Sequence, residues 1–115
     1  MRKLARSFKY AFEGMASAIQ TETNWKIGLL EALFTIFISF YFHIKKSDWI
    51  IIIIMISMVL AAELINSAIE TIVDSFTQDQ HPGAKLAKDF AAGAVVIIII
   101  ASAIIGSLIF IPYIK

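Results

Sequence analysis

The chain has 115 residues, of which 59% are hydrophobic, and its formal net charge at pH 7 is +1. A chain of this length builds at most one domain, and so apolar a composition is unusual for a water-soluble domain this short. The small net charge gives no electrostatic argument for binding nucleic acid, and the absence of cysteine excludes disulfides and thiolate metal sites.

Residues 1–20 are predicted to form a helix that lies on the membrane surface. Apolar residues recur there at spacings of three and four and therefore share one helical face, and they are Leu4, Phe8, Ala11, Phe12, Met15 and Ile19. Basic residues fall largely elsewhere. A basic amphipathic helix suits the interface, where its cations meet anionic headgroups.

Three membrane-spanning helices are predicted to follow, over about residues 27–44, 49–73 and 90–111, joined by loops at 43–48 and 75–88. At about 1.5 Å per residue, each crosses most or all of a hydrocarbon core of roughly 30 Å. Trp25, Trp49 and Tyr113 are expected at the span boundaries, where amphipathic rings prefer to lie.

The distribution of Lys and Arg predicts the orientation. Seven of these residues fall beside the N-terminus and in the second loop, against three on the other side, which favours a cytoplasmic N-terminus. The small residues Ser102 and Gly106 of the last span form a pair that favours close helix packing, within the chain or between chains.

Four polar residues form a stripe along the second predicted span. Glu63, Asn66, Glu70 and Asp74 are spaced by three, four and four residues, so they fall on one face of a helix. An unpaired charge in lipid costs at least about 2–3 kcal/mol, so such residues normally face a bundle interior or water and mark functional sites. With only three helices to enclose them, oligomerisation would supply an interior.

The stripe is open to a catalytic and a structural interpretation. Converging carboxylates can hold Mg²⁺, which commonly shares its oxygen ligands with nucleotide phosphates, and a further carboxylate could accept a proton from an attacking hydroxyl. Glu22, Lys88 and Asp89 are expected on the same cytoplasmic side, where they could complete a metal or phosphate site. Alternatively, the stripe pairs with Lys85, Lys88 or a second subunit for structure alone.

The segment from Glu63 to Asp74, ELINSAIETIVD, resembles the signature of the prokaryotic lipid kinases that include diacylglycerol kinase and undecaprenol kinase, and the resemblance covers nearly the whole chain. It implies an all-α homotrimer of three-span subunits, each with a surface helix, in the bacterial plasma membrane. It also implies composite active sites at the cytoplasmic interface that transfer the γ-phosphate of Mg·ATP to a lipid hydroxyl.

The resemblance further implies individual roles. Glu63 matches the general base, Asn66 the polar residue beside it, and Glu22 and Glu70 the metal-binding carboxylates that also border the nucleotide. The remaining nucleotide positions are matched by Tyr10, Asp79, Gln80, His81, Lys88 and Asp89, and by Lys3 where the diacylglycerol kinases carry arginine.

The segments Glu22–Lys26 and His81–Lys85 resemble the undecaprenol kinase branch more than the diacylglycerol kinases. Undecaprenol is therefore the predicted acceptor, and diacylglycerol, which would yield phosphatidic acid, is the alternative. A small oligomeric ion channel or membrane scaffold is the alternative of another class. The outer halves of the spans contain stretches without polar residues, such as 50–54 and 95–100. This disfavours a conducting pore.

Overall fold

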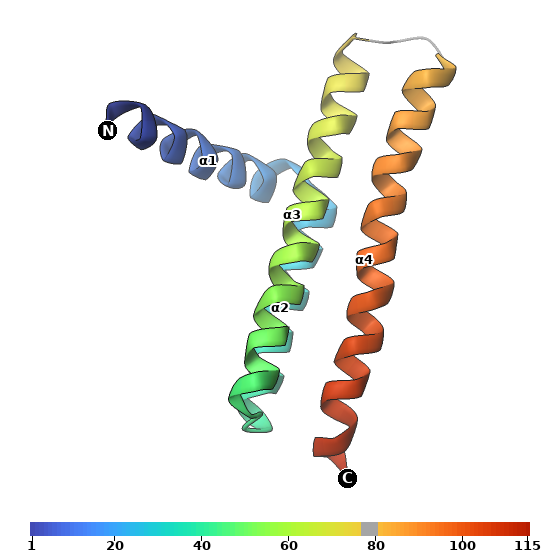
Figure 1. Cartoon of the computed structure of the whole chain (residues 1–115). Helices are drawn as coiled ribbons and strands as arrows, with labels where there is room; N and C mark the ends of the chain where they lie inside the picture. Colours follow the sequence, from blue (N-terminus) through green and yellow to red (C-terminus); the bar gives the residue numbers. More distant parts are fainter. Residues whose placement is uncertain (77–80) are drawn as a thin grey trace.

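The computed structural model describes residues 1–76 and 81–115. Four helices follow one another: α1 (Arg2–Thr21), α2 (Thr23–Tyr41), α3 (Lys46–Phe76) and α4 (Pro82–Ile114). The helices α2, α3 and α4 run side by side in alternating directions, and α1 leads away from them at a steep angle (Figure 1). The all-α prediction is confirmed, and α1 matches the helix predicted over 1–20.

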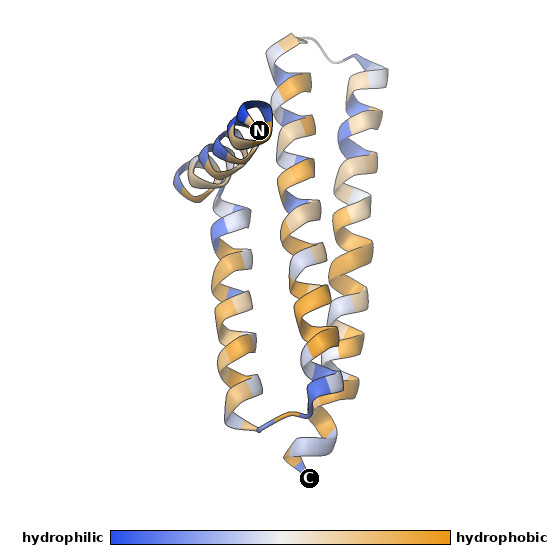
Figure 2. Cartoon of the chain, turned by 60° about the vertical axis from the view of Figure 1, so that its left-hand side comes forward, coloured by the Kyte–Doolittle hydropathy of each residue, from blue (hydrophilic) through white to orange (hydrophobic). Residues whose placement is uncertain are grey.

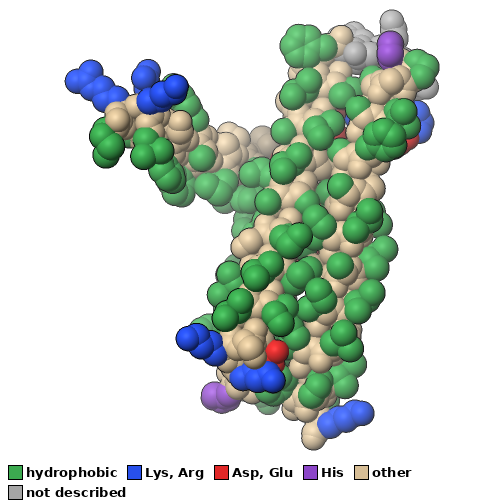
Figure 3. Space-filling view, in the orientation of Figure 1, with side chains coloured by type: hydrophobic (Ala, Val, Ile, Leu, Met, Phe, Trp, Pro, Cys, Tyr) green, Lys and Arg blue, Asp and Glu red, His purple; other side chains and the backbone are tan. Residues whose placement is uncertain are grey.

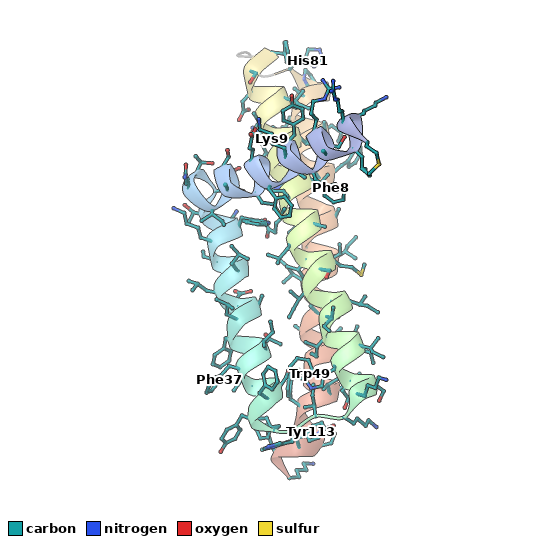
Figure 4. All side chains as sticks on the ribbon, turned by 90° about the vertical axis from the view of Figure 1, so that its left-hand side faces the viewer. Phe8, Lys9, Phe37, Trp49, His81 and Tyr113 are labelled. Atoms are coloured by element: carbon teal, nitrogen blue, oxygen red, sulfur yellow. The ribbon has the colours of Figure 1, made fainter. Side chains whose placement is uncertain are left out.

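The corner between α1 and α2 is a single extended residue, Glu22, with φ −104° and ψ 103°. The amphipathic pattern of α1 is visible in its side chains, since Phe8 and Lys9 extend from different sides of the helix (Figure 4). A helix that turns away from the bundle at one residue keeps its apolar face free to lie along an interface.

The end of α2 differs from its predicted end at residue 44. The helix stops at Tyr41, where His43 takes φ 53° and the chain reverses. The amide of Ile44 donates to the carbonyl of Ser39 (3.3 Å), and that of His43 to Phe40 (3.2 Å). This is the paired hydrogen bonding of a Schellman motif, which ends a helix through one left-handed residue.

Two residues bring α2 against α3. The indole Nε1 of Trp25 donates to the carbonyl oxygen of Leu60 (3.0 Å), and Trp25 is 5% exposed. At Gly28, an added Cβ would lie 3.2 Å from Leu60 Cδ2. Trp25 lies in the first turn of α2, near the predicted span boundary, and its ring packs between the two helices.

The helices α3 and α4 are joined near both ends. Lys88 Nζ donates to Asp74 Oδ1 (2.9 Å) near the first end, and Tyr113 Oη donates to Asp48 Oδ2 (2.8 Å) near the second. The backbone amide of Lys45 also donates to Tyr113 Oη (3.1 Å). These two joints are 25 residues apart on α4 and 26 on α3, so the antiparallel pairing holds one axial alignment along the whole contact.

The start of α4 also differs from expectation, because residues 82–88 are helical and not part of a loop. His81 caps the helix by accepting hydrogen bonds at Nδ1 from the amides of Gly83 (3.0 Å) and Ala84 (3.4 Å). Pro82 suits the first helical turn, where its missing N–H costs nothing. At the other end, Pro112 lies inside the last turn, beyond the predicted end of the span at residue 111.

Among the described residues, α3 and α4 are the two helices long and apolar enough to cross a membrane. Apolar residues dominate most of their length, and polar residues gather toward the ends (Figure 2). Large hydrophobic side chains are exposed along all three helices of the bundle, and they cover much of the face shown in Figure 3. Such a surface is stable in lipid or against another protein, not in water. Within the chain, an added Cβ at Gly106 would meet no atom within 4 Å, so Gly106 is not in close contact with another helix there.

Candidate active site

The polar stripe lies along α3 as its spacing predicts. Its buried member is Asn66, which is 8% exposed, and Glu63 and Glu70 are half-buried on the turns on either side. Asp74 follows one turn nearer to the end of α3, which lies beside the start of α4 (Figure 1). The stripe therefore grades from apolar surroundings at Glu63 toward the exposed helix end at Asp74.

Asn66 holds the side chain of Glu70. Its Nδ2 donates to Glu70 Oε1 at 3.0 Å, while its buried Oδ1 has no hydrogen-bond partner in the described part of the chain. The resemblance placed Asn66 beside the base Glu63, but the hydrogen bond is made to Glu70. Glu63 itself forms no side-chain hydrogen bond with any other described residue. One carboxylate of the stripe is thus oriented, and the other is open to an incoming hydroxyl.

The basic residues of α4 are both paired with carboxylates. Lys88 reaches across to Asp74, and Lys85 Nζ pairs with Asp89 Oδ2 at 2.6 Å on the same helix. Lys88 lies ahead of the apolar part of α4, and its hydrogen bond to Asp74 together with the charge of that carboxylate raises the pKa of Lys88. Both pairs are exposed to a large extent, and exposed pairs are weak. A phosphate could therefore compete for either lysine.

A groove of about 530 Å³ lies between α1, the corner and α3. It brings Tyr10 and Glu22, two of the predicted nucleotide residues, opposite Ser67 and Thr71 on α3. Neither Glu70 nor Lys88 lines it. In a single chain, the predicted nucleotide residues therefore divide between this groove and the Lys88–Asp74 pair.

The remaining predicted residues lie apart from the groove. Lys3 is exposed near the free end of α1, which extends away from the bundle (Figure 1). The ring of His81 is occupied by capping α4, at the end of the bundle near α1 and opposite Trp49 and Tyr113 (Figure 4). Asp79 and Gln80 fall outside the described residues.

The carboxylates suit a metal that shares its coordination with a substrate. Over residues 1–76 and 81–115, no three His, Asp or Glu side chains gather closely enough to enclose an ion. Mg²⁺ usually needs only one or two protein carboxylates when phosphates and water supply its other ligands. Glu70, oriented by Asn66, and Glu22, which lines the groove, are hard oxygen donors of the kind Mg²⁺ takes.

Comparison with known proteins shows the family to which the chain belongs. Residues 9–110 match the family described as prokaryotic diacylglycerol kinase. The chain belongs to this family. Its members are lipid kinases, so the chain is a phosphotransferase acting on a lipid, and the channel and scaffold alternatives give way to an enzyme with a nucleotide co-substrate.

Individual relatives cover most of the chain. It is 38% identical over 112 residues to the undecaprenol kinase of Bacillus subtilis, spanning 97% of this chain and 91% of that one. It is 34% identical to the diacylglycerol kinase of Synechocystis, over 92% of this chain and 61% of the relative. The diacylglycerol kinase of Haemophilus influenzae is also 34% identical, over 82% and 80% of the two chains.

Sequence reasoning missed the hydroxyl side of the groove. Ser67 and Thr71 are four residues apart, beside the acidic stripe, and both line the groove that contains Glu22. Small hydroxyl residues at that spacing were a usable signal for a second polar face on α3. Over the length of the stripe, α3 is therefore polar on two adjacent faces, and not on the face of the stripe alone.

Proposed function

We propose that the chain is an undecaprenol kinase that transfers the γ-phosphate of Mg·ATP to the hydroxyl of undecaprenol. The proposal rests on its similarity to the B. subtilis undecaprenol kinase, which extends over nearly the full length of both chains at 38% identity. Diacylglycerol is the second candidate acceptor, because several of the relatives are diacylglycerol kinases at up to 34% identity.

The proposed membrane arrangement has three spans, formed by α2, α3 and α4, with α1 on the cytoplasmic surface. Two of these helices are long and apolar enough to cross a bilayer. The polar first turn of α2 and Glu31 lower its hydropathy, but it lies alongside α3 and its 19 residues extend about 28 Å. The Lys and Arg distribution supports a cytoplasmic N-terminus and active site in the bacterial plasma membrane.

In the proposed mechanism, the residues of the stripe have different roles according to their position along α3. Glu63 accepts the proton of the lipid hydroxyl as the new oxygen–phosphorus bond forms, and the bond between the γ-phosphorus and the bridging oxygen breaks to release ADP. Its open carboxylate, toward the apolar part of α3, supports this role. Glu70 and Glu22 are the proposed holders of Mg²⁺, which when bound neutralises phosphate charge. Asn66 keeps Glu70 in position.

The proposed nucleotide site combines groups from the surface helix and α4. Lys88 would exchange Asp74 for a phosphate, and Tyr10 lies in the groove beside Glu22. Lys3, Asp79, Gln80, His81 and Asp89 complete the proposed nucleotide contacts. Because Lys3 lies far from the stripe of its own chain, the proposal places it against a neighbouring copy.

A homotrimer with composite sites is therefore part of the proposal, with residues 1–115 acting as one lipid-kinase domain. The apolar outer surface supports close association in the membrane, and the division of the site residues within one chain supports sharing between subunits. Half-buried carboxylates in a three-helix unit gain an enclosed setting when copies assemble.

The test is phosphate transfer from ATP labelled at the γ position, in detergent–lipid micelles with undecaprenol and diacylglycerol as competing acceptors. We expect preferential labelling of undecaprenol, and its loss in Glu63→Gln. Preferential labelling of diacylglycerol would keep the enzyme class and replace the acceptor. No labelling of either lipid by folded, oligomeric protein would contradict the proposal.

A further inference from the structure

A cavity of about 160 Å³ lies between α2, α3 and α4, inside the proposed membrane region. Its α3 wall includes Ile52, Ile56 and Val59. These residues and Glu63 are spaced by four, three and four, so the cavity and the polar stripe share one face of α3. The cavity therefore lies directly beneath Glu63 along the helix.

The axial alignment of α3 and α4 determines which residues of the α4 wall lie near Glu63. Since Lys88 faces Asp74 and the two helices are antiparallel, Ser102 on α4 lies level with Leu60 on α3. Glu63 is three residues from Leu60, or about 4.5 Å along the axis. Ser102 Oγ is buried and has no hydrogen-bond partner among the residues the structure describes. The end of the cavity nearest Glu63 thus carries an unused hydroxyl.

The main part of the cavity lies beside Gly106, where α4 has no side chain to fill it. Gly106 lines it one turn beyond Ser102, and a Cβ added there would meet no atom within 4 Å. Glu31 and Thr35 of α2 also line the cavity, but Thr35 Oγ1 already donates to the Glu31 carbonyl oxygen and Glu31 is exposed. The space is therefore mostly apolar, with Glu31 on its α2 wall and an unused hydroxyl at its Glu63 end.

We infer that this cavity receives the part of the acceptor chain next to the hydroxyl, and that Gly106 and Ser102 determine which lipid alcohols fit. The inference rests on the proposed function. In this arrangement, the hydroxyl of the lipid lies at the end of the cavity between Glu63 and Ser102, and the first carbons of its chain pass Gly106.

The size of the cavity favours a single slender chain. An apolar cavity of about 150 Å³ holds one benzene ring, so 160 Å³ accommodates roughly six carbons. A linear polyprenol presents one chain directly behind its hydroxyl. The glycerol of diacylglycerol instead carries two ester groups and two chains close to its hydroxyl, which the cavity is too small to enclose.

The first test fills the cavity from α4. We expect Gly106→Leu to raise the KM for undecaprenol at least tenfold with little change in the KM for Mg·ATP, and Gly106→Ala to have a smaller effect in the same direction. Ala103→Leu is the matched control, because it adds a similar volume on an exposed part of the same helix. A wild-type KM for undecaprenol in both Gly106 variants would overturn the inference while leaving the kinase activity in place.

The second test needs no turnover, and so separates this inference from the proposed function. A polyprenol carrying a photoreactive diazirine a few carbons from its hydroxyl is crosslinked to the full-length protein in micelles, and the labelled peptides are mapped. We expect labelling of α3 and α4 around Ile56 and Gly106, suppressed in Gly106→Leu and retained in Glu63→Gln. Labelling confined to α1 or to the outer surface of the bundle would overturn the inference. Absence of phosphate transfer to undecaprenol by the wild type would contradict the proposed acceptor instead.

Discussion

The indole Nε1 of Trp25 donates to the carbonyl oxygen of Leu60 at 3.0 Å, and this hydrogen bond joins the first turn of α2 to the middle of α3. Glu22 lies three residues before Trp25, and Glu63 three residues after Leu60. The bond therefore fixes the relative height of two carboxylates that come from different helices and serve one proposed site.

Replacing Trp25 by Phe removes this hydrogen bond and keeps an aromatic ring. We expect the variant to lose about 1 kcal/mol of stability, as for a typical intramolecular hydrogen bond, and to need more Mg·ATP for half-maximal rate. Thermal unfolding in micelles and steady-state kinetics measure the two effects. Trp49→Phe is the control, because Trp49 packs on Phe40 with 4.8 Å between ring centroids and its indole N–H makes no hydrogen bond to another described residue. Equal changes in both variants would contradict the assigned role of Trp25.

Glu63→Gln should lower kcat by about 10²- to 10⁴-fold, the usual contribution of a general base. The amide keeps the size of the side chain but cannot take the hydroxyl proton, so Mg·ATP binding should remain. Rapid measurement of phosphate transfer together with binding of a fluorescent nucleotide distinguishes the two steps. Activity near that of the wild type would remove Glu63 from the role of base.

Asn66→Ala should raise the Mg²⁺ concentration for half-maximal activity by about 10-fold, because it removes the donor that orients Glu70, and partners of metal ligands commonly contribute that much. The measurement is a Mg²⁺ titration of initial rate at saturating ATP. Ser57→Ala, on an exposed part of the same helix away from the groove, provides the comparison. An unchanged Mg²⁺ dependence in Asn66→Ala would show that Glu70 acts without this support.

Lys88→Met should raise the KM for Mg·ATP at least tenfold, since the proposed phosphate contact loses its charge. Asp74→Asn should leave the thermal midpoint nearly unchanged, because the pair it breaks is exposed and such pairs are weak. If Asp74→Asn destabilised the protein strongly and Lys88→Met left the KM unchanged, the pair would be structural, as one interpretation of the sequence held.

The helices were predictable because their apolar blocks are long, but their ends were not. The end of α2 depends on His43 adopting a left-handed conformation, and the start of α4 on the ring of His81 replacing a solvent contact. Neither follows from periodicity, since both are decided by single side chains and backbone angles. The hydrogen-bond partner of Trp25 was not predictable for a related reason, because a carbonyl on α3 takes the place that water or a headgroup would otherwise fill.

The stripe on α3 was predictable because it depends only on spacing along one helix. The pairing of Asn66 with Glu70 depends on side-chain rotamers. The pairing of Lys88 with Asp74, two residues 14 apart in the chain, depends on the axial alignment of two helices. The cavity beneath Glu63 involves three helices at once. Properties of this kind arise only when the helices are assembled.

The two joints between α3 and α4 have a consequence for the bilayer itself. Between the Lys88–Asp74 and Tyr113–Asp48 contacts, 25 residues of α4 extend about 37 Å, somewhat more than a hydrocarbon core of roughly 30 Å. Two helices that pack side by side over this length do not shorten, so a thinner membrane must be met by tilting the pair as a unit or by deforming the lipid. Tilting would carry Lys88 and the stripe together toward or away from the headgroups. Membrane thickness is thereby coupled to the depth at which the enzyme meets its lipid.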